Sequence, residues 1–174
     1  MLIELGHFAL VLALGVALAQ ATLPLIGAGR GHAGWMGMAA PAALAQLGLV
    51  GLAFAALMHA YIVSDFSVLN VAANSHSTKP LLYKISGVWG NHEGSMLLWV
   101  TILALFGAAV AVFGRSLPPA LKARVLAVQA MIGFGFLAFI LATSDPFLRL
   151  DPAPLNGNDL NPMLQDPGLA FHPP

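Results

Sequence analysis

The stretch SDFSVLNVAANSHSTKPLLYKISGVWGNHEGS occupies residues 64–95, and long apolar runs with almost no charge flank it on both sides. Polar groups are costly inside a bilayer because no water is there to hydrogen-bond them. We call residues 64–95 the polar island. Its position predicts a surface segment that connects two membrane-embedded runs, and we interpret the rest of the chain around it.

The composition predicts an integral membrane protein. Of the 174 residues, 59% are hydrophobic and only 8% are charged, whereas a soluble domain carries about 25% charged residues. The net charge is zero and the chain has no run of Lys or Arg, which argues against binding to nucleic acid. The absence of cysteine excludes disulfides, thiolate metal sites and thiol redox chemistry by this chain.

Four apolar runs are long enough to cross a bilayer as helices, which takes about 20 residues. They predict an all-α, polytopic fold, and the third run is short enough that it could begin inside the polar island. The first run lacks a basic segment before it, so we expect an uncleaved span rather than a signal peptide. Small residues such as Gly107 and Gly133 predict close helix packing. The predicted spans are residues 5–26, 40–63, 96–113 and 121–142.

The charged residues divide unequally between the two predicted sides of the membrane. The segments 27–39 and 114–124 hold four basic residues and no acidic one, and the other side holds three basic and seven acidic residues. Lys and Arg in short loops mark the cytoplasmic face. We therefore expect the N-terminus, the polar island and the tail (residues 143–174) outside, which is the periplasm of a Gram-negative cell. Five histidines fall on that side: His7, His59, His76, His92 and His172.

The middle of the polar island predicts a short interfacial helix. Pro80 suits the first turn of a helix that Ser77 or Thr78 would cap. Leu81 and Leu82 begin its apolar side, which we expect to lie in the membrane interface. Residues 70–78, just before it, are interpreted as a polar loop.

The end of the polar island, Trp89-Gly90-Asn91-His92-Glu93-Gly94, is open to two interpretations. Glu93 could orient a neighbouring imidazole, because liganding histidines often give their second N–H to a carboxylate. Alternatively, Asn91 and Glu93 cap the third span, where acid complements the helix dipole. We expect Trp89, Asn91, His92, Glu93 and, more weakly, His76 to support a site or face a partner.

The tail, residues 143–174, holds seven of the 12 prolines and several Asp-Pro and Asn-Pro turn signals. It also carries large apolar side chains such as Phe147, so we expect an ordered, turn-rich flap on the outer surface. The tail ends in Phe171-His172-Pro173-Pro174, and proline favours an extended backbone at His172. From the residues alone, a histidine there is usually an ordinary tail residue.

Residues 64–99 and the segment DLNPMLQDPGLAFHPP (residues 159–174) resemble the N-terminal part of the cytochrome c maturation protein F family of bacterial haem lyase subunits. A paralogous haem lyase subunit dedicated to a nitrite reductase shares much of this pattern and remains an alternative. The resemblance implies a multi-pass protein of the bacterial inner membrane with its site on the periplasmic side. It further implies partners, namely a haem chaperone, other maturation subunits and apocytochrome c.

The same resemblance implies that His172 is an axial ligand of haem iron, the only metal expected, held as b-type haem on its way to a c-type cytochrome. Imidazole is a suitable ligand for haem iron. The family is much longer than 174 residues, so we interpret the chain as a fragment or a split subunit that is inactive alone, with no catalytic residue assigned. Two other functions are weighed: a structural scaffold, and an ion- or proton-translocating subunit. A translocating subunit usually needs ionisable groups within its spans, and the interiors of these spans offer little beyond Gln20, Gln46 and Gln129.

Overall fold

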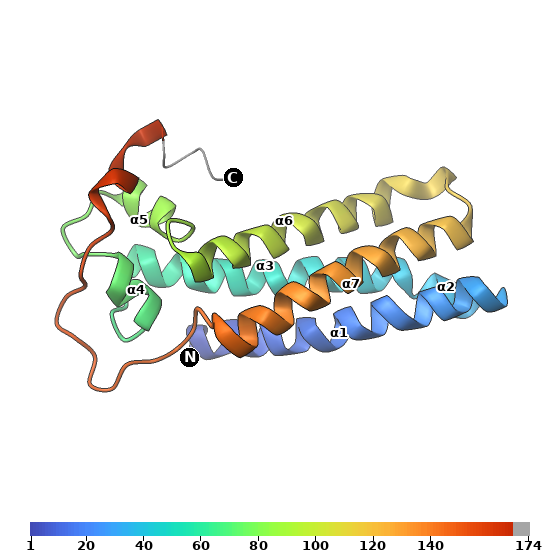
Figure 1. Ribbon diagram of the computed structural model, residues 1–174, viewed down its shortest axis with the longest axis horizontal. Helices are drawn as coiled ribbons and strands as arrows, with labels where there is room; N and C mark the ends of the chain where they lie inside the picture. The colour runs from blue at the N-terminus through green and yellow to red at the C-terminus, as the bar shows by residue number, and fades with distance from the viewer. Residues whose placement is uncertain (169–174) are drawn as a thin grey trace.

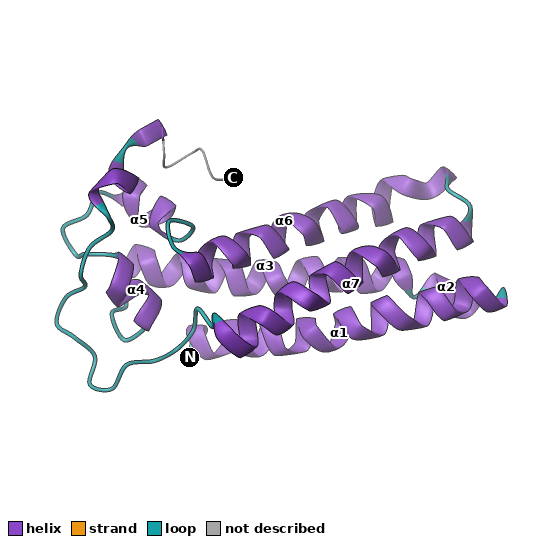
Figure 2. Cartoon of the chain, viewed as in Figure 1, coloured by secondary structure: helices purple, strands orange, loops and turns teal. Residues whose placement is uncertain are grey.

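The computed structural model describes residues 1–168, and its long helices form an up-and-down four-helix bundle. Figures 1 and 2 show α1 and α6 running away from the N-terminal end of the molecule, while α3 and α7 return to it. α1 packs against α3 and α7, and α6 packs against the same two helices. The predicted all-α fold is confirmed. The long helices are α1 (Leu2–Arg30), α3 (Ala39–Val63), α6 (His92–Phe113) and α7 (Pro119–Thr143).

All four long helices are long and apolar enough to cross a membrane. Even α6, with 22 residues, spans about 33 Å at 1.5 Å per residue, against roughly 30 Å of hydrocarbon. The helices enclose the four predicted spans and extend past them. The third span was predicted to start at residue 96, but α6 begins at His92. His92 and Glu93 therefore belong to its first turn rather than to a loop.

The bundle is packed through small residues, while large apolar side chains point outward. Ala13 and Ala53 are fully buried, whereas the side chains of Phe8 and Phe106 are more than half exposed. Small residues let helix backbones approach closely where lipid, not water, surrounds the bundle. At Gly107 an added Cβ would lie 2.9 Å from the carboxamide of Gln129, which confirms the close packing expected there.

The two ends of the bundle differ. One end carries α2 (Ala33–Gly37) and the 3-10 helix η1 (Gly114–Ser116). There His32 caps α2, its Nδ1 accepting a hydrogen bond from the Trp35 amide at 3.2 Å. The other end holds the N-terminus, α4 (Leu69–Asn74), α5 (Leu81–Gly87) and the tail with η2 (Pro162–Gln165). We call residues 64–91 and 144–168 the polar cap.

Two predictions about the polar island were wrong in detail. Residues 69–74 form the helix α4 rather than a loop, because Val71 and its neighbours are buried and Val71 packs into the apolar core of the bundle. Pro80 itself is the N-cap of α5, and its side chain makes no capping hydrogen bond, so Ser77 and Thr78 do not cap that helix. Leu81 and Leu82 are both exposed, whereas Ser86, which was expected to face away from the apolar side, is buried; the location of α5 in the membrane interface stays a prediction.

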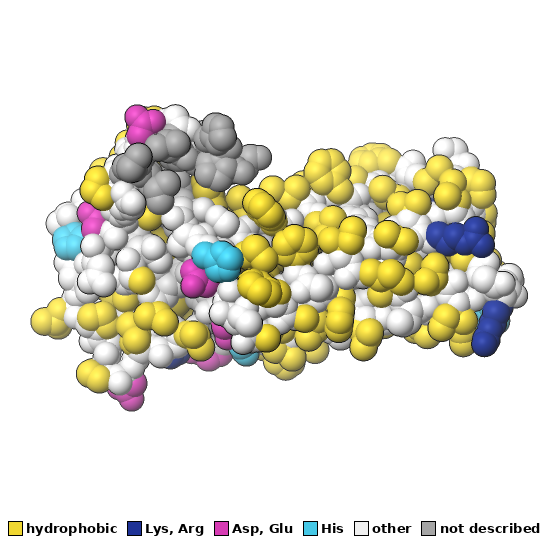
Figure 3. Space-filling view, viewed as in Figure 1, with side chains coloured by type: hydrophobic (Ala, Val, Ile, Leu, Met, Phe, Trp, Pro, Cys, Tyr) yellow, Lys and Arg dark blue, Asp and Glu magenta, His cyan; other side chains and the backbone are white. Residues whose placement is uncertain are grey.

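The surface of the molecule follows this division into two ends. Figure 3 shows apolar side chains covering the bundle, acidic side chains at the polar cap and basic side chains at the opposite end. Arg30, Arg115, Lys122 and Arg124 all belong to that opposite end by their position in the chain. The N-terminus, the polar island and the described tail thus share one end, as the charge distribution predicted.

Candidate functional site

Asn91 is the centre of the polar cap. Its Oδ1 accepts a hydrogen bond from the Gly94 amide at 2.8 Å, which makes it the N-cap of α6. Its Nδ2 donates to the Tyr61 hydroxyl at 3.0 Å and to the Gly87 carbonyl at 2.9 Å. The capping interpretation of Asn91 is therefore confirmed. One side chain here joins the end of α5, the start of α6 and the end of α3.

A hydrogen-bonded network extends from Asn91 into the core. The Tyr61 hydroxyl donates to Asn70 Oδ1 at 2.6 Å, and Asn70 Nδ2 donates to Asn91 Oδ1 at 2.8 Å and to Glu93 Oε2 at 3.3 Å. Tyr61 is completely buried and Asn70 is nearly so. An aromatic residue near the end of a span often lies at headgroup depth, but Tyr61 is an internal residue, because the network satisfies its hydroxyl.

The five described residues that were predicted to support a site separate into two groups. Asn91 and Glu93 meet in the network with Tyr61 and Asn70. Trp89 is half-buried against the apolar core. His92 is exposed, with its ring edge-to-face with Phe139 at 6.1 Å between centroids. His76 bonds within its own loop, where its Nδ1 lies 2.8 Å from Thr78 Oγ1.

The structure does not assemble a metal site from its titratable side chains. Among residues 1–168, no group of three or more His, Cys, Asp or Glu side chains could hold a metal ion. His172, the predicted haem ligand, lies outside the described residues. His7 pairs with Asp145, with 3.1 Å between Nδ1 and Oδ2.

The tail is fixed along the polar island by hydrogen bonds and one buried ion pair. Lys79 Nζ lies 2.9 Å from Asp159 Oδ1 and donates to the Asn74 carbonyl at 3.1 Å. The Lys79 side chain is only 1% exposed, and this burial lowers its pKa, although Asp159 opposes the shift. The hydrogen bond from Lys79 in turn lowers the pKa of Asp159. The ordered, turn-rich flap predicted from the prolines is confirmed for its described part.

A second fastening joins the tail to the start of the chain. Arg149 donates to Glu4 through Nε at 3.0 Å, contacts Asp65 at 3.3 Å and also bonds the Ser67 hydroxyl. The hydrogen bond to Glu4 raises the pKa of Arg149, so the guanidinium stays charged. Nearby, the Leu150 amide donates to the Ser67 carbonyl at 2.8 Å. The sequence placed all these charges on one side but gave no signal for their pairing.

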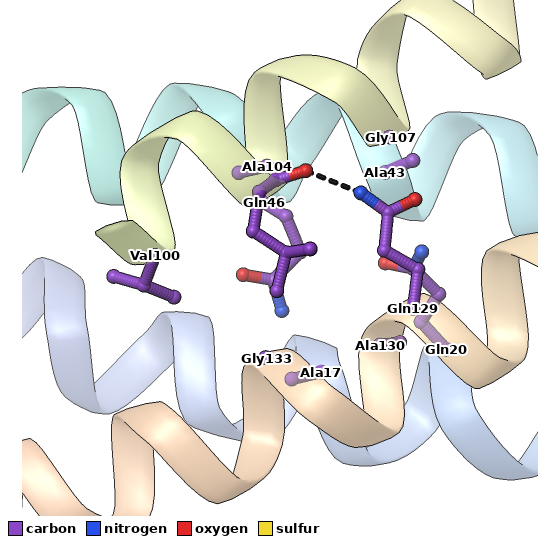
Figure 4. A pocket seen from close by; sticks show the side chains of 11 residues that line it. Ala17, Gln20, Ala43, Gln46, Val100, Ala104, Gly107, Gln129, Ala130 and Gly133 are labelled. Atoms are coloured by element: carbon purple, nitrogen blue, oxygen red, sulfur yellow. Dashed lines mark hydrogen bonds between the residues drawn. The ribbon is translucent and has the colours of Figure 1, made fainter. Parts of the chain in front are cut away.

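The interior of the bundle contains a small, mostly apolar cavity of about 30 Å³ (Figure 4). Three glutamines line it, and each donates to a backbone carbonyl of a neighbouring helix: Gln20 to Leu126, Gln46 to Ala13 and Gln129 to Leu103. The other residues that line the cavity are apolar or glycine. None of the lining residues is ionisable, and the three glutamines act as interhelical contacts.

Together the bundle and its cap define a multi-pass helical membrane protein with one polar, tail-covered end. Residues 89–174 match the family described as "Cytochrome C assembly protein". Over its full length the chain is 67% identical to "Cytochrome c-type biogenesis protein ccl1" of Rhodobacter capsulatus and 63% identical to "Cytochrome c-type biogenesis protein CycK" of Rhizobium meliloti. It covers 27% and 26% of those proteins.

A solved structure is also similar. It is titled "Cytochrome c Heme Lyase CcmF", with a TM-score of 0.79 and 28% identity, and the match covers 84% of this chain and 25% of that one. The chain belongs to the cytochrome c assembly protein family, as its island and tail motifs predicted. It spans about a quarter of the length of the relatives that it matches.

Proposed function

We propose that this chain forms the N-terminal membrane portion of a haem lyase that serves cytochrome c biogenesis. The observation that carries the proposal is the 67% identity, along all 174 residues, with a protein named for cytochrome c-type biogenesis. The similarity to a structure titled as a haem lyase supports the same conclusion. Haem is then the substrate, a b-type haem that is passed on to a c-type cytochrome.

In this proposal His172 provides the axial ligand to haem iron, and imidazole suits that role. The described part of the tail supports the assignment. The ion pair between Lys79 and Asp159 joins the tail to the polar island, and the tail stays at the same end of the bundle through Gly168 (Figure 1). Asn91 and Glu93 are positioning residues, since their polar atoms are engaged within the network. His92 is exposed, and it faces a partner protein together with Trp89 and His76 in this proposal.

We further propose that the polar cap faces the periplasm and the basic end faces the cytoplasm of a bacterial inner membrane. The excess of Lys and Arg at the end opposite the cap favours this orientation. The partners at the cap are then a haem chaperone, other maturation subunits and apocytochrome c. Labelling of a single cysteine at Ser77 or at Ser116 by an impermeant maleimide tests the orientation. Labelling of intact spheroplasts only at position 116 would contradict it.

A structural scaffold is the alternative function, and one observation favours it. The polar side chains of Tyr61, Asn70 and Asn91 bond to one another where the cap meets the bundle. Such a network holds helices together without any ligand. Under this alternative the cap would only support the remainder of a larger assembly.

The deciding experiment compares His172→Ala with His32→Asn in the full-length protein and its complex. We expect His172→Ala to lower both the haem absorbance per mole of purified complex and the yield of cytochrome c. His32→Asn is the control, because His32 caps α2 at the end of the bundle opposite the polar cap (Figure 1) and asparagine can keep that cap, and it should leave both unchanged. If the two variants behave alike at equal protein levels, the ligand assignment is wrong and the scaffold function is favoured.

A further inference from the structure

The basic end of the bundle contains a groove between the starts of two long helices. It has a volume of about 460 Å³ and lies between α2, the start of α3 and the connection from α6 to α7. Its walls are apolar, with Met36 and Ala40 on one side and Leu117 and Pro119 on the other. Two cations, Arg115 and Lys122, complete the lining.

The two cations in the groove have no acidic partner. All seven Asp and Glu residues belong to the N-terminus, the polar island, the start of α6 or the tail, which lie at the other end of the molecule. The ion pairs of the described residues accordingly include neither Arg115 nor Lys122. Lys122 donates one hydrogen bond, to the Ala111 carbonyl at 2.7 Å, and an ammonium has three donors. Donors therefore remain for an anion.

The backbone adds positive potential at the same place. α3 begins at Ala39 and α7 at Pro119, and both residues line the groove. Neither N-cap residue, Met38 or Pro118, caps its helix with a side-chain hydrogen bond. The first amide groups of a helix carry a partial positive charge and favour an anion. The groove thus combines two cations, two helix starts and apolar walls.

We propose that this groove binds the headgroup of an anionic phospholipid. It lies at the ends of helices long enough to cross a membrane, where headgroups are the anions at hand. Basic pockets between transmembrane helices are known to take acidic lipid headgroups. The phosphate lies between Arg115 and Lys122, and the glycerol and upper acyl chains lie against Met36 and Leu117. A zwitterionic lipid lacks the net charge that these cations select.

The test uses the full-length protein in detergent, titrated with phosphatidylglycerol or phosphatidylethanolamine and followed by native mass spectrometry. Each basic residue near an anionic headgroup contributes about 1 kcal/mol. The double variant Arg115→Gln/Lys122→Gln should therefore bind phosphatidylglycerol roughly 30-fold more weakly. Arg115→Gln alone, an exposed change in η1, should cost about fivefold and leaves the Lys122 hydrogen bond to α6 in place.

The matched control is Arg30→Gln/Arg124→Gln, which removes the same charge from the same end but does not touch the lining of the groove. We expect this control to keep the affinity of the unaltered protein within about threefold, because screened charges farther away act weakly. An equal loss of affinity for phosphatidylglycerol in both double variants would mean that the basic end attracts the lipid only through its overall charge. That result would overturn the proposal. Equal binding of inorganic phosphate would overturn the lipid assignment. Equal binding of phosphatidylethanolamine would overturn the charge selection.

Discussion

Replacement of Asn91 by alanine should strongly destabilise the protein. The change removes the side-chain cap of α6, which costs about 1 kcal/mol. It also removes the donor to the Tyr61 hydroxyl and one acceptor for Asn70, in a region where Tyr61 is completely buried. A buried polar group that loses its partner costs about 1–3 kcal/mol.

Two remaining bonds limit the cost of the lost partners to that of one buried polar group. Tyr61 still donates to Asn70, and Asn70 still reaches Glu93 at 3.3 Å. The expected loss is therefore about 2–4 kcal/mol in the free energy of unfolding. The assay is unfolding of the full-length protein by SDS in mixed micelles, with Asn91→Ser as a second variant. Serine restores the cap but not the carboxamide donor, so it should recover about 1 kcal/mol.

Asn156→Ala is the control for the Asn91 series. Asn156 also bonds through its carboxamide, to the Ser77 amide at 3.0 Å, but this contact is exposed. Its loss should cost no more than about 1 kcal/mol, because water replaces the bond. The reasoning is refuted if Asn91→Ala is no more destabilising than Asn156→Ala, or if serine recovers all of the stability. The latter result would mean that capping, and not the network, accounts for the whole effect.

Three further predictions concern the fastening of the tail and the packing of α1. Gly6→Ala should cost about 1–3 kcal/mol in unfolding experiments, because its Cβ would lie 2.8 Å from Ala56 and 2.9 Å from Phe147, whereas Gly15→Ala, with open space, should be neutral or stabilising. Asp159→Asn should loosen the tail to proteolysis at pH 7 by leaving buried Lys79 unpaired. Because the pKa of Asp159 is lowered in the folded protein, the stabilisation that its carboxylate provides is present above about pH 4 and is lost as the pH falls further. The unaltered protein and Asp159→Asn should therefore be cleaved at similar rates in acid. Arg149→Gln should cost about 1 kcal/mol, measured by the same proteolysis, and added salt should shrink the difference, because the ion pairs of Arg149 are partly exposed.

Much of the fold was predictable because the bilayer imposes it. Hydrophobic length predicted four membrane-spanning helices, and the distribution of charge predicted that the N-terminus, the polar island and the described part of the tail share one end (Figure 1). α6 begins at His92, inside the polar island, as the short third run allowed. The apolar run alone did not locate this start, since a helix that begins with His92 and Glu93 does not look apolar. α4 was not predicted because Asn70 looks like a loop residue in the sequence. In the fold it is buried and donates a hydrogen bond to Asn91, which lies 21 positions further along the chain.

The site was predictable only in part, for a related physical reason. Residue type and spacing identified Asn91 and Glu93, and local rules allowed the cap to be foreseen. The partners of Lys79 and Arg149 could not be foreseen, because each pair closes a loop of 80 residues or more. A sequence carries the charges but not the path of a proline-rich tail, which alone decides which of them meet.

The two fastenings of the tail also differ in kind, and this difference bears on the proposed function. The ion pair between Lys79 and Asp159 is shielded on the lysine side, whereas Arg149 binds Glu4 and Asp65 in partly exposed contacts. A screened, exposed contact gives way more readily than a buried one. The ion pairs of Arg149 should therefore break more readily than the ion pair between Lys79 and Asp159. If His172 is the haem ligand, the attachment that matters is the one at Asp159. Asp159→Asn should then lower the haem content of the full-length complex while Arg149→Gln leaves it unchanged. The opposite order would show that the start of the tail, and not its end, positions the ligand.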